Sequence, residues 1–276
     1  MNEPGNRLIR DLSNEDYHRH PSLSKSQLAE FLISPARYYG LYLDPARPLV
    51  AETTGQRAGS LLHTLVLEPE TFSQRYAVGP DCNRNTKAWK AFEETLPEGI
   101  TPLKAEELDT AHRQATSLRA HQEIAELLGS GTAEASMFWQ DTETGVDCRV
   151  RPDWLHESGE NGLIVLDIKT GPANPRLFAL QVARMTYDLQ DAMYTTGIEA
   201  VTGKTVLAFV FGVVGSAPPY LSSCCMLDDL SRDSGMRKFR RGLKDFAECQ
   251  RTNHWPGYQD VQLITVPAWA LELDEE

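Results

Sequence analysis

The chain has 276 residues, of which 41% are hydrophobic and 24% are charged, an ordinary balance for a soluble globular protein with enough material for a core. Its formal net charge of −12 argues against broad, nonspecific binding to nucleic acid. Net charge does not exclude a local basic channel, so a specific nucleic-acid site stays compatible with this composition.

The N-terminal half is predicted to be mainly helical after a polar start. The first 20 residues are polar, and residues 11–21 resemble a loop. Ser24 followed by Gln27 is a capping-box pattern, which predicts a helix that begins there. Pro35 predicts the start of a second helix, because proline is favoured at the first helical position. The other helices expected in this half are 55–67, a segment around Trp89, and 106–128.

The C-terminal half is predicted to hold a sheet. The turn signal over residues 141–145 makes a hairpin of the segments on either side of it. The strands expected are 133–140, 147–155, 162–168, 205–214 and 219–226, and the helices are 176–197 and 231–252. This order predicts one α/β domain. We divide the chain into a polar segment (1–20), a domain over 21–268 (mainly helical 21–130, sheet core 131–268) and an acidic tail (269–276).

Two acids and a lysine form the most informative pattern. Pro152-Asp153 lies 14 residues before Asp167, which stands two residues before Lys169 at the end of an apolar run. Alternate residues of a strand share a face, so Asp167 and Lys169 should project together, with Asp153 reaching the same point from the preceding strand. Two carboxylates and an amine at one place suit metal-assisted cleavage of a phosphodiester bond. The alternative is a strand-end acid beside a solvated lysine.

Three further groups support this interpretation, each with a simpler alternative. His63 flanks an apolar helical face, where an imidazole could reach a cleft or could be satisfied at the edge of the core. Gln190 and Tyr194 stand four residues apart on one helix face, which suits contact with a phosphate or base, or only an ordinary surface pair. One face of the final predicted helix is basic, and this basic stripe could face DNA or solvent. Its members are Arg237, Arg240, Arg241 and Lys244.

The compartment is expected to be the cytoplasm. No apolar run approaches the ~20 residues that span a bilayer, and the N-terminus lacks an apolar signal core, so we expect no membrane partner. The five cysteines are odd in number, form no CxxC and include the adjacent Cys224 and Cys225. We expect reduced thiols and neither a disulfide framework nor a zinc or iron–sulfur cluster.

Together these motifs resemble the PD-(D/E)xK nucleases, and in order and approximate spacing the RecB-like nuclease domains. Further segments are similar to the exonuclease VIII (RecE-type) branch. These segments are Tyr17-His, Ser22-Leu-Ser24-Lys25-Ser26-Gln-Leu, Ser34-Pro-Ala, Gly59-Ser-Leu-Leu-His63 and Trp255-Pro-Gly-Tyr258. The resemblance covers about residues 11–268. It implies a restriction-endonuclease-like α/β fold, in which helices flank a mixed central sheet and a helical elaboration precedes it.

The resemblance also implies a role for each residue. Asp153, Asp167, Lys169 and Glu134 would be catalytic, with Glu134 on the first strand of the hairpin. The metal would be Mg²⁺, with Mn²⁺ able to substitute, and each site would hold two ions. The ligands would be His63, Asp153, Asp167 and the Ile168 carbonyl. DNA would contact Gln190, Tyr194, Ser24, Lys25, Ser26 and Arg151. For Ser24, Lys25 and Ser26 the alternative is simple helix capping, since a helix start suits both.

The activity that the resemblance implies is 5′-to-3′ exonucleolytic digestion of double-stranded DNA from its ends, which leaves 3′ single-stranded tails for recombination. It also implies a ring-shaped homo-oligomer around the duplex and a strand-annealing recombinase as partner. Three alternatives remain: a monomeric single-strand or structure-specific nuclease, a non-catalytic DNA-end adaptor on the same scaffold, and an acidic DNA mimic.

Overall fold

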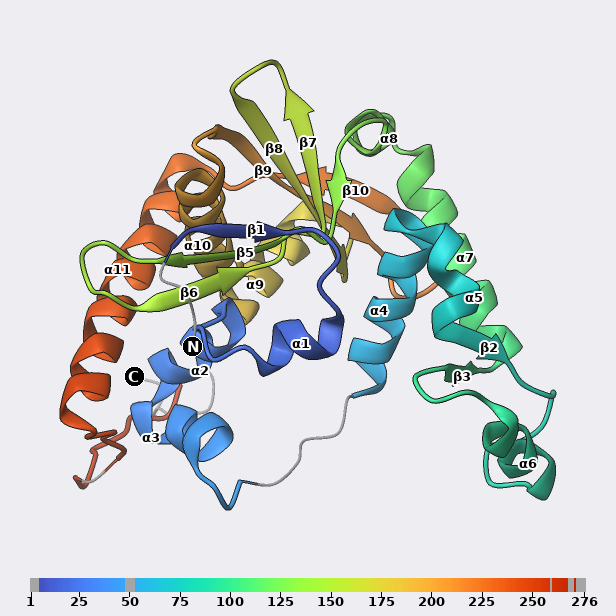
Figure 1. Cartoon of the computed structure of the whole chain (residues 1–276), viewed down its shortest axis with the longest axis horizontal. Helices are drawn as coiled ribbons and strands as arrows, with labels where there is room; N and C mark the ends of the chain where they lie inside the picture. The colour runs from blue at the N-terminus through green and yellow to red at the C-terminus, as the bar shows by residue number, and fades with distance from the viewer. Residues whose placement is uncertain (1–4, 48–52, 259, 268–270, 272–276) are drawn as a thin grey trace, which may run out of the picture.

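Two parallel strands, β8 (Gly162–Thr170) and β9 (Thr205–Val214), form the centre of a five-stranded mixed sheet (Figure 1). On one side β7 (Trp154–Ser158) pairs antiparallel with β8, and β4 (Thr132–Ala133) with β7. On the other side β10 (Ser222–Cys225) pairs antiparallel with β9. The computed structural model describes residues 5–47, 53–258, 260–267 and 271.

The central strand β8 is buried on both faces, which explains its continuous apolar run. Leu163 and Val165 pack into one core, whereas Leu166 and Ile168 pack into the other. The side-chain period of two therefore places Asp167 on the first face and the Ile168 side chain on the second.

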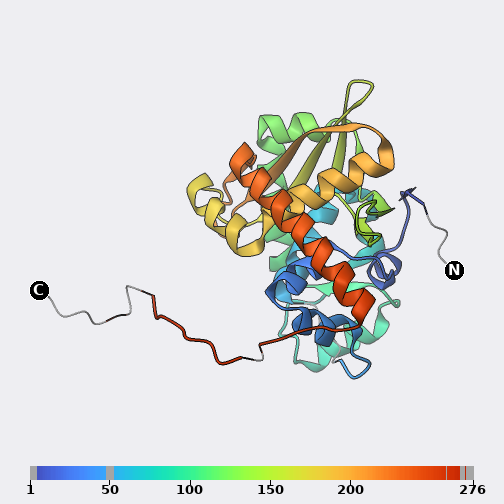
Figure 2. The same ribbon diagram turned by 90° about the vertical axis from the view of Figure 1, so that its left-hand side faces the viewer.

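Helices cover both faces of this sheet. The face of Val165 lies against α2 (Lys25–Ile33), α9 (Pro175–Met185), α10 (Tyr187–Thr202) and α11 (Asp229–Thr252). Figure 2 shows α11 running diagonally across this layer. The opposite face lies against α4 (Thr54–Leu67), α7 (Ala105–Ala120) and α8 (Gln122–Leu128). This arrangement is the predicted restriction-endonuclease-like fold, a mixed sheet flanked by helices.

Two smaller sheets complete the fold. One joins β1 (Arg7–Ile9), β5 (Ser136–Gln140) and β6 (Asp147–Val150) as an antiparallel set. The other pairs β2 (Tyr76–Val78) with β3 (Thr101–Leu103) in parallel. The remaining short helices are α1 (Asn14–Arg19), α3 (Pro35–Tyr38), the π-helix Tyr39–Leu43, the 3-10 helix Pro69–Thr71, α5 (Phe72–Arg75) and α6 (Lys87–Thr95).

Several predicted elements are confirmed. The Ser24 capping box is present with both of its hydrogen bonds, and Pro35 begins α3. The 141–145 turn joins β5 and β6 as a hairpin, and the strand predicted over 205–214 has those bounds. The last helix buries Phe239, Leu243 and Phe246. Its Arg237, Arg241 and Lys244 are exposed, whereas Arg240 binds Asp141 at 2.5 Å.

Three predicted elements were wrong because the structure divides each of them into two. The helix expected over 106–128 is divided at His121, and the helix expected over 176–197 is divided at Thr186, which has a left-handed φ of 50°. The strand expected over 147–155 ends at Val150, and β7 begins in a different sheet at Trp154. Proline cannot donate to a strand ladder, so Pro152 suits the crossing between them.

The loop expected over residues 11–21 was also wrong. Ser13 caps α1 by accepting the Asp16 amide, and β1 precedes that helix. β1 exists because it pairs with β5, a contact that local composition does not reveal. Of the predicted acidic tail, all but Leu271 lies outside the described residues. No helix in the described ranges is both long and apolar enough to cross a bilayer.

A buried arginine fastens the N-terminal segment to β6. The Arg149 side chain is only 2% exposed and donates hydrogen bonds to the carbonyls of His18, His20 and Ser22, while its guanidinium lies over the Tyr17 ring at 5.2 Å. A buried cation is stabilised only by such partners. The bonds therefore hold residues 17–22 against the hairpin.

We expect Arg149→Met to lower the free energy of unfolding by about 3 kcal/mol, because three charge-assisted hydrogen bonds are lost and the carbonyl of the buried Ser22 loses this donor. Urea denaturation followed by circular dichroism measures this change. Arg241→Ala, which removes an exposed guanidinium, should change stability by less than about 0.5 kcal/mol. Equal stability of the two variants would contradict the anchoring role.

Candidate active site

Five of the predicted residues meet where β8 ends. His63 comes from α4, and Glu134 lies between β4 and β5. Asp153 immediately precedes β7, and Asp167 and Lys169 lie on β8. The site therefore combines a helix of the N-terminal half with the five-stranded sheet and the link from β4 to β5, which sequence spacing alone does not show.

His63, Glu134 and Asp153 form a group that could hold a metal ion. One ligand atom from each lies within 4.8 Å of the others. The Nε2 atom of His63 is 3.5 Å from Asp153 Oδ2 and 3.1 Å from the Ile168 carbonyl oxygen, and its Nδ1 atom is 3.9 Å from Glu134 Oε1. Two carboxylates, a carbonyl and an imidazole fit a divalent cation such as Mn²⁺, and the oxygen donors also suit Mg²⁺.

Backbone contacts bring these acids together. The Ile168 amide donates to Asp153 Oδ2 at 2.6 Å, and the Glu134 amide donates to the Asp153 carbonyl at 3.1 Å. Glu134 was expected inside a strand, but it lies in the break between two strands with a left-handed φ of 48°. Non-glycine residues seldom adopt this conformation, and such strain concentrates at functional sites.

Asp167 and Lys169 project together from β8, as the strand period predicts. The Lys169 ammonium contacts Asp167 Oδ2, and the Gln190 amide donates to Asp167 Oδ1 at 2.6 Å. Asp167 is 1% exposed, so this carboxylate is fully enclosed. Both of its oxygens have partners within the protein, and the described metal-binding group does not include it. Its part as a metal ligand stays a prediction.

Burial and neighbouring charges shift the pKa values of the acidic side chains strongly. Burial, and secondly the Asp153 carboxylate, raises the pKa of Glu134 to about 7. Burial raises the pKa of Asp167 to about 6, although Lys169 opposes the shift. Burial would lower the pKa of Lys169, but the Asp167 carboxylate, helped by Asp153 and Tyr187, outweighs it, so the lysine pKa is raised. The Asp167–Lys169 pair is therefore ionised at neutral pH.

The residues predicted to bind DNA lie close to this site but differ in burial and in the contacts they already make. Gln190 is buried against Asp167, whereas Tyr194 lines the cavity of about 670 Å³ that holds the metal-binding group. Arg151 also lines this cavity, but it stacks on the Tyr17 ring at 4.1 Å and donates to the Leu12 carbonyl at 3.0 Å. Their contact with DNA stays a prediction.

The start of α2 lies near Lys169 of β8. Ser24 caps this helix by accepting the Gln27 amide, and Ser26 is exposed. Lys25 donates to the Met185 carbonyl at 2.6 Å, and burial together with the Lys169 charge lowers its pKa to about 8. Capping by Ser24 is thus confirmed, and phosphate binding by this segment stays a prediction.

The sequence analysis missed much of the cavity wall. Residues 10–14, Tyr17 and His18 line it, although they were expected to form a loop of no stated role. Glu68 and Arg75 line it as well, joined by an ion pair of 2.8 Å. The Tyr17-His pair in the family resemblance was the only signal, and nothing local marks Arg75.

Comparison with known proteins agrees with this geometry. Residues 24–264 match the family described as a PDDEXK-like domain of unknown function (DUF3799). The chain belongs to this family. Membership makes the chain part of the PD-(D/E)xK superfamily that the sequence resembles. No curated protein sequence is significantly similar to this PDDEXK-like chain.

Solved structures with the same architecture include a candidate exonuclease from Eubacterium rectale. It is 15% identical with a TM-score of 0.58, and the match covers 94% of this chain and 96% of that one. An alkaline exonuclease from Laribacter hongkongensis is also 15% identical, with a TM-score of 0.32 and coverage of 87% and 97%. The first likeness shows the restriction-endonuclease-like fold of the PDDEXK-like domain.

We expect Glu134→Gln to stabilise the metal-free protein above pH 7 by about 1–3 kcal/mol, the scale of the pKa shift after some solvent screening. The raised pKa means that ionising Glu134 costs stability as pH rises from 4.5 to about 7, so the gain should vanish near pH 4.5. Thermal unfolding in chelator at several pH values measures it. A variant that is less stable at pH 8 would contradict the repulsion.

Metal affinity should rise by about tenfold per pH unit between pH 5.5 and 7, because Glu134 must lose its proton before it can bind a cation. Isothermal titration with Mn²⁺ measures this dependence. His63→Ala should weaken binding, whereas replacing the exposed His112 with alanine should leave it unchanged. Binding that is unaffected in His63→Ala would remove this histidine from the ligand set.

Proposed function

We propose that this chain is a metal-dependent exodeoxyribonuclease that degrades double-stranded DNA from its ends. The observation that carries the proposal is the convergence of His63, Glu134 and Asp153 beside the ionised Asp167–Lys169 pair. Membership of the PDDEXK-like family supports it, as does the fold shared with a candidate exonuclease. The described donor set is complete for phosphodiester chemistry, which favours an enzyme over a non-catalytic adaptor.

The residues divide the chemistry among them. His63, Glu134, Asp153 and the Ile168 carbonyl would hold the cation, with Asp167 as a further candidate ligand. A bound divalent ion supplies an activated water and neutralises charge on the phosphate. Lys169 remains a cation at neutral pH, so we assign it to stabilising negative charge on the phosphate rather than to accepting a proton. Its side chain is 16% exposed and contacts Asp167 on β8, next to the Ile168 carbonyl that faces His63.

Gln190 is a positioning residue in this scheme. Its amide fixes one oxygen of Asp167, so the other oxygen faces Lys169. This arrangement keeps the lysine charged and oriented. Tyr194, at the wall of the cavity, is proposed to contact the DNA strand.

The finer parts of the proposal rest on the RecE-type resemblance. They are 5′-to-3′ polarity, production of 3′ tails for recombination, Mg²⁺ as the ion, two ions per site, a ring-shaped homo-oligomer, a strand-annealing partner, and a cytoplasmic location. A ring would also reconcile the net charge of −12 with DNA binding, since only its inner channel would have to be basic.

Digestion of linear duplex DNA tests the proposal. With Mg²⁺ or Mn²⁺, the wild type should release label from a 5′ end before label from a 3′ end, and EDTA should stop release. Lys169→Ala should reduce the rate by roughly a hundredfold or more, because the charge stabilisation is lost. Lys90→Ala, which removes an exposed lysine on α6, should cleave like the wild type.

Other outcomes separate the alternatives. Earlier release of the 3′ label would reverse the polarity but keep the nuclease. Preference for single strands by a monomer would favour a structure-specific enzyme. Tight binding to DNA ends without any metal-dependent release would favour the adaptor and leave the Asp153–Asp167 cluster a structural one.

A further inference from the structure

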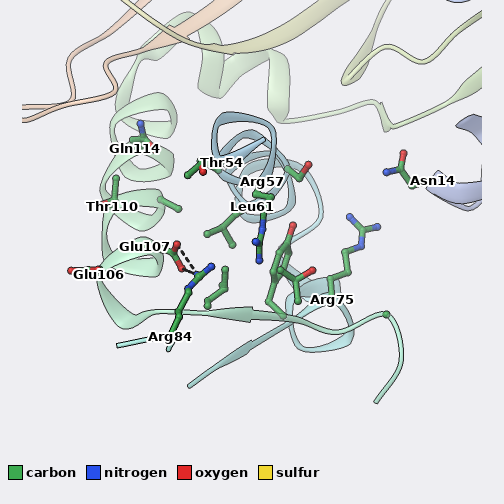
Figure 3. Close-up of a pocket in the computed structure, with 17 residues that line it drawn as sticks. Asn14, Thr54, Arg57, Leu61, Arg75, Arg84, Glu106, Glu107, Thr110 and Gln114 are labelled. Atoms are coloured by element: carbon green, nitrogen blue, oxygen red, sulfur yellow. Dashed lines mark hydrogen bonds and ion pairs between the residues drawn. The ribbon is translucent and has the colours of Figure 1, made fainter. Parts of the chain in front are cut away.

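A second cavity, of about 570 Å³, adjoins the candidate active site between α4, α7 and the strands β2 and β3 (Figure 3). Asn14, Ser60, Arg75 and Tyr76 line both cavities, so the two share a wall. The volume lies within the range of small-ligand sites, roughly 300–1,000 Å³. Any ligand there would be next to the metal-binding group.

Arg57, Arg75 and Arg84 line this cavity, and the last two have acidic partners. Arg84 binds both oxygens of Glu107, at 2.9 and 2.6 Å, and Arg75 is paired with Glu68. The side chain of Arg57 makes no hydrogen bond or ion pair within the described part of the chain, and Figure 3 shows it pointing into the cavity. A guanidinium in this state suits an anionic group, and phosphate above all.

The rest of the wall suits a flat organic body. Leu61 and Leu103 are buried and give the cavity an apolar floor. Thr54 and Thr110 offer hydroxyl groups from facing helices. The Gln114 amide nitrogen donates to the Gly215 carbonyl at 2.9 Å, which leaves its own carbonyl oxygen as an acceptor. A mostly apolar cavity with a few polar groups is the usual environment of a specific small ligand.

We propose that this second cavity binds a nucleotide, with its phosphate on Arg57 and its base against Leu61 and Leu103. A nucleotide combines an anion, an apolar face and hydrogen-bonding edges, and each part has a counterpart in the wall. The proposal rests on the proposed nuclease function, since the shared wall places such a ligand beside the site where a DNA strand would be cut. The same chemistry belongs to a nucleotide still joined to the strand and to a released mononucleotide.

Binding of deoxyadenosine 5′-monophosphate to the full chain in EDTA tests this site without requiring cleavage. The wild type should bind it, and Arg57→Ala should weaken binding by about tenfold or more, the effect of losing a charged hydrogen bond. Deoxyadenosine lacks the phosphate, so it should bind the wild type about as weakly as the mononucleotide binds Arg57→Ala. Arg113→Ala, which removes an exposed guanidinium on α7, is the matched control and should bind normally.

A second variant guards against an indirect effect. Ala58→Trp adds bulk from an exposed position in the wall and keeps Arg57, so it should also block binding, with circular dichroism confirming the fold. No binding by the wild type at millimolar nucleotide, or normal binding by both variants, would overturn the proposal. A protein that binds the nucleotide but never cleaves DNA would overturn only the nuclease function, and an active nuclease that ignores the nucleotide would overturn only this site.

Cleavage kinetics distinguish the two sources of the nucleotide. A raised KM for duplex DNA in Arg57→Ala, with kcat little changed, would place a nucleotide of the strand in the cavity. An unchanged KM with loss of inhibition by the mononucleotide would place the released product there. Both results support a nucleotide site.

Discussion

The hydrogen bond from the Ile168 amide to the Asp153 carboxylate is the contact on which the site depends. It joins the residue that precedes β7 to the C-terminal part of β8, the neighbouring strand of the same sheet. With that amide fixed, the Ile168 carbonyl meets His63 on one side, while Asp167 and Lys169 project on the other. One backbone group thereby relates the two halves of the candidate site.

The sheet supplies the contrast between these halves. Asp167 and Lys169 form an enclosed ion pair on one face of β8. The cavity with the metal-binding group is lined from both helical layers, by His63 of α4 and by Tyr194 of α10. The enclosed pair keeps a fixed charge, since its bonds are made within the protein. The Glu134 and Asp153 carboxylates at the cavity repel each other, and a bound divalent cation would relieve this repulsion.

Residues within regular elements were predictable from the sequence. The alternation in β8 placed Asp167 beside Lys169, and the pattern of α4 placed His63 at the edge of an apolar face. Glu134 was located only through the family resemblance and was misplaced in a strand, because its conformation depends on contacts with Asp153. The wall formed by residues 10–18 was not predictable, because pairing between β1 and β5 is remote in sequence.

The anchoring of Arg149 bears on where the functional unit can be cut. Family similarity begins at residue 24, yet the carbonyls that satisfy this buried guanidinium belong to residues 18, 20 and 22. A fragment that began at the family boundary would keep the cation and discard its acceptors, along with part of the cavity wall. The unit that satisfies this buried cation is therefore larger than the region of recognisable similarity.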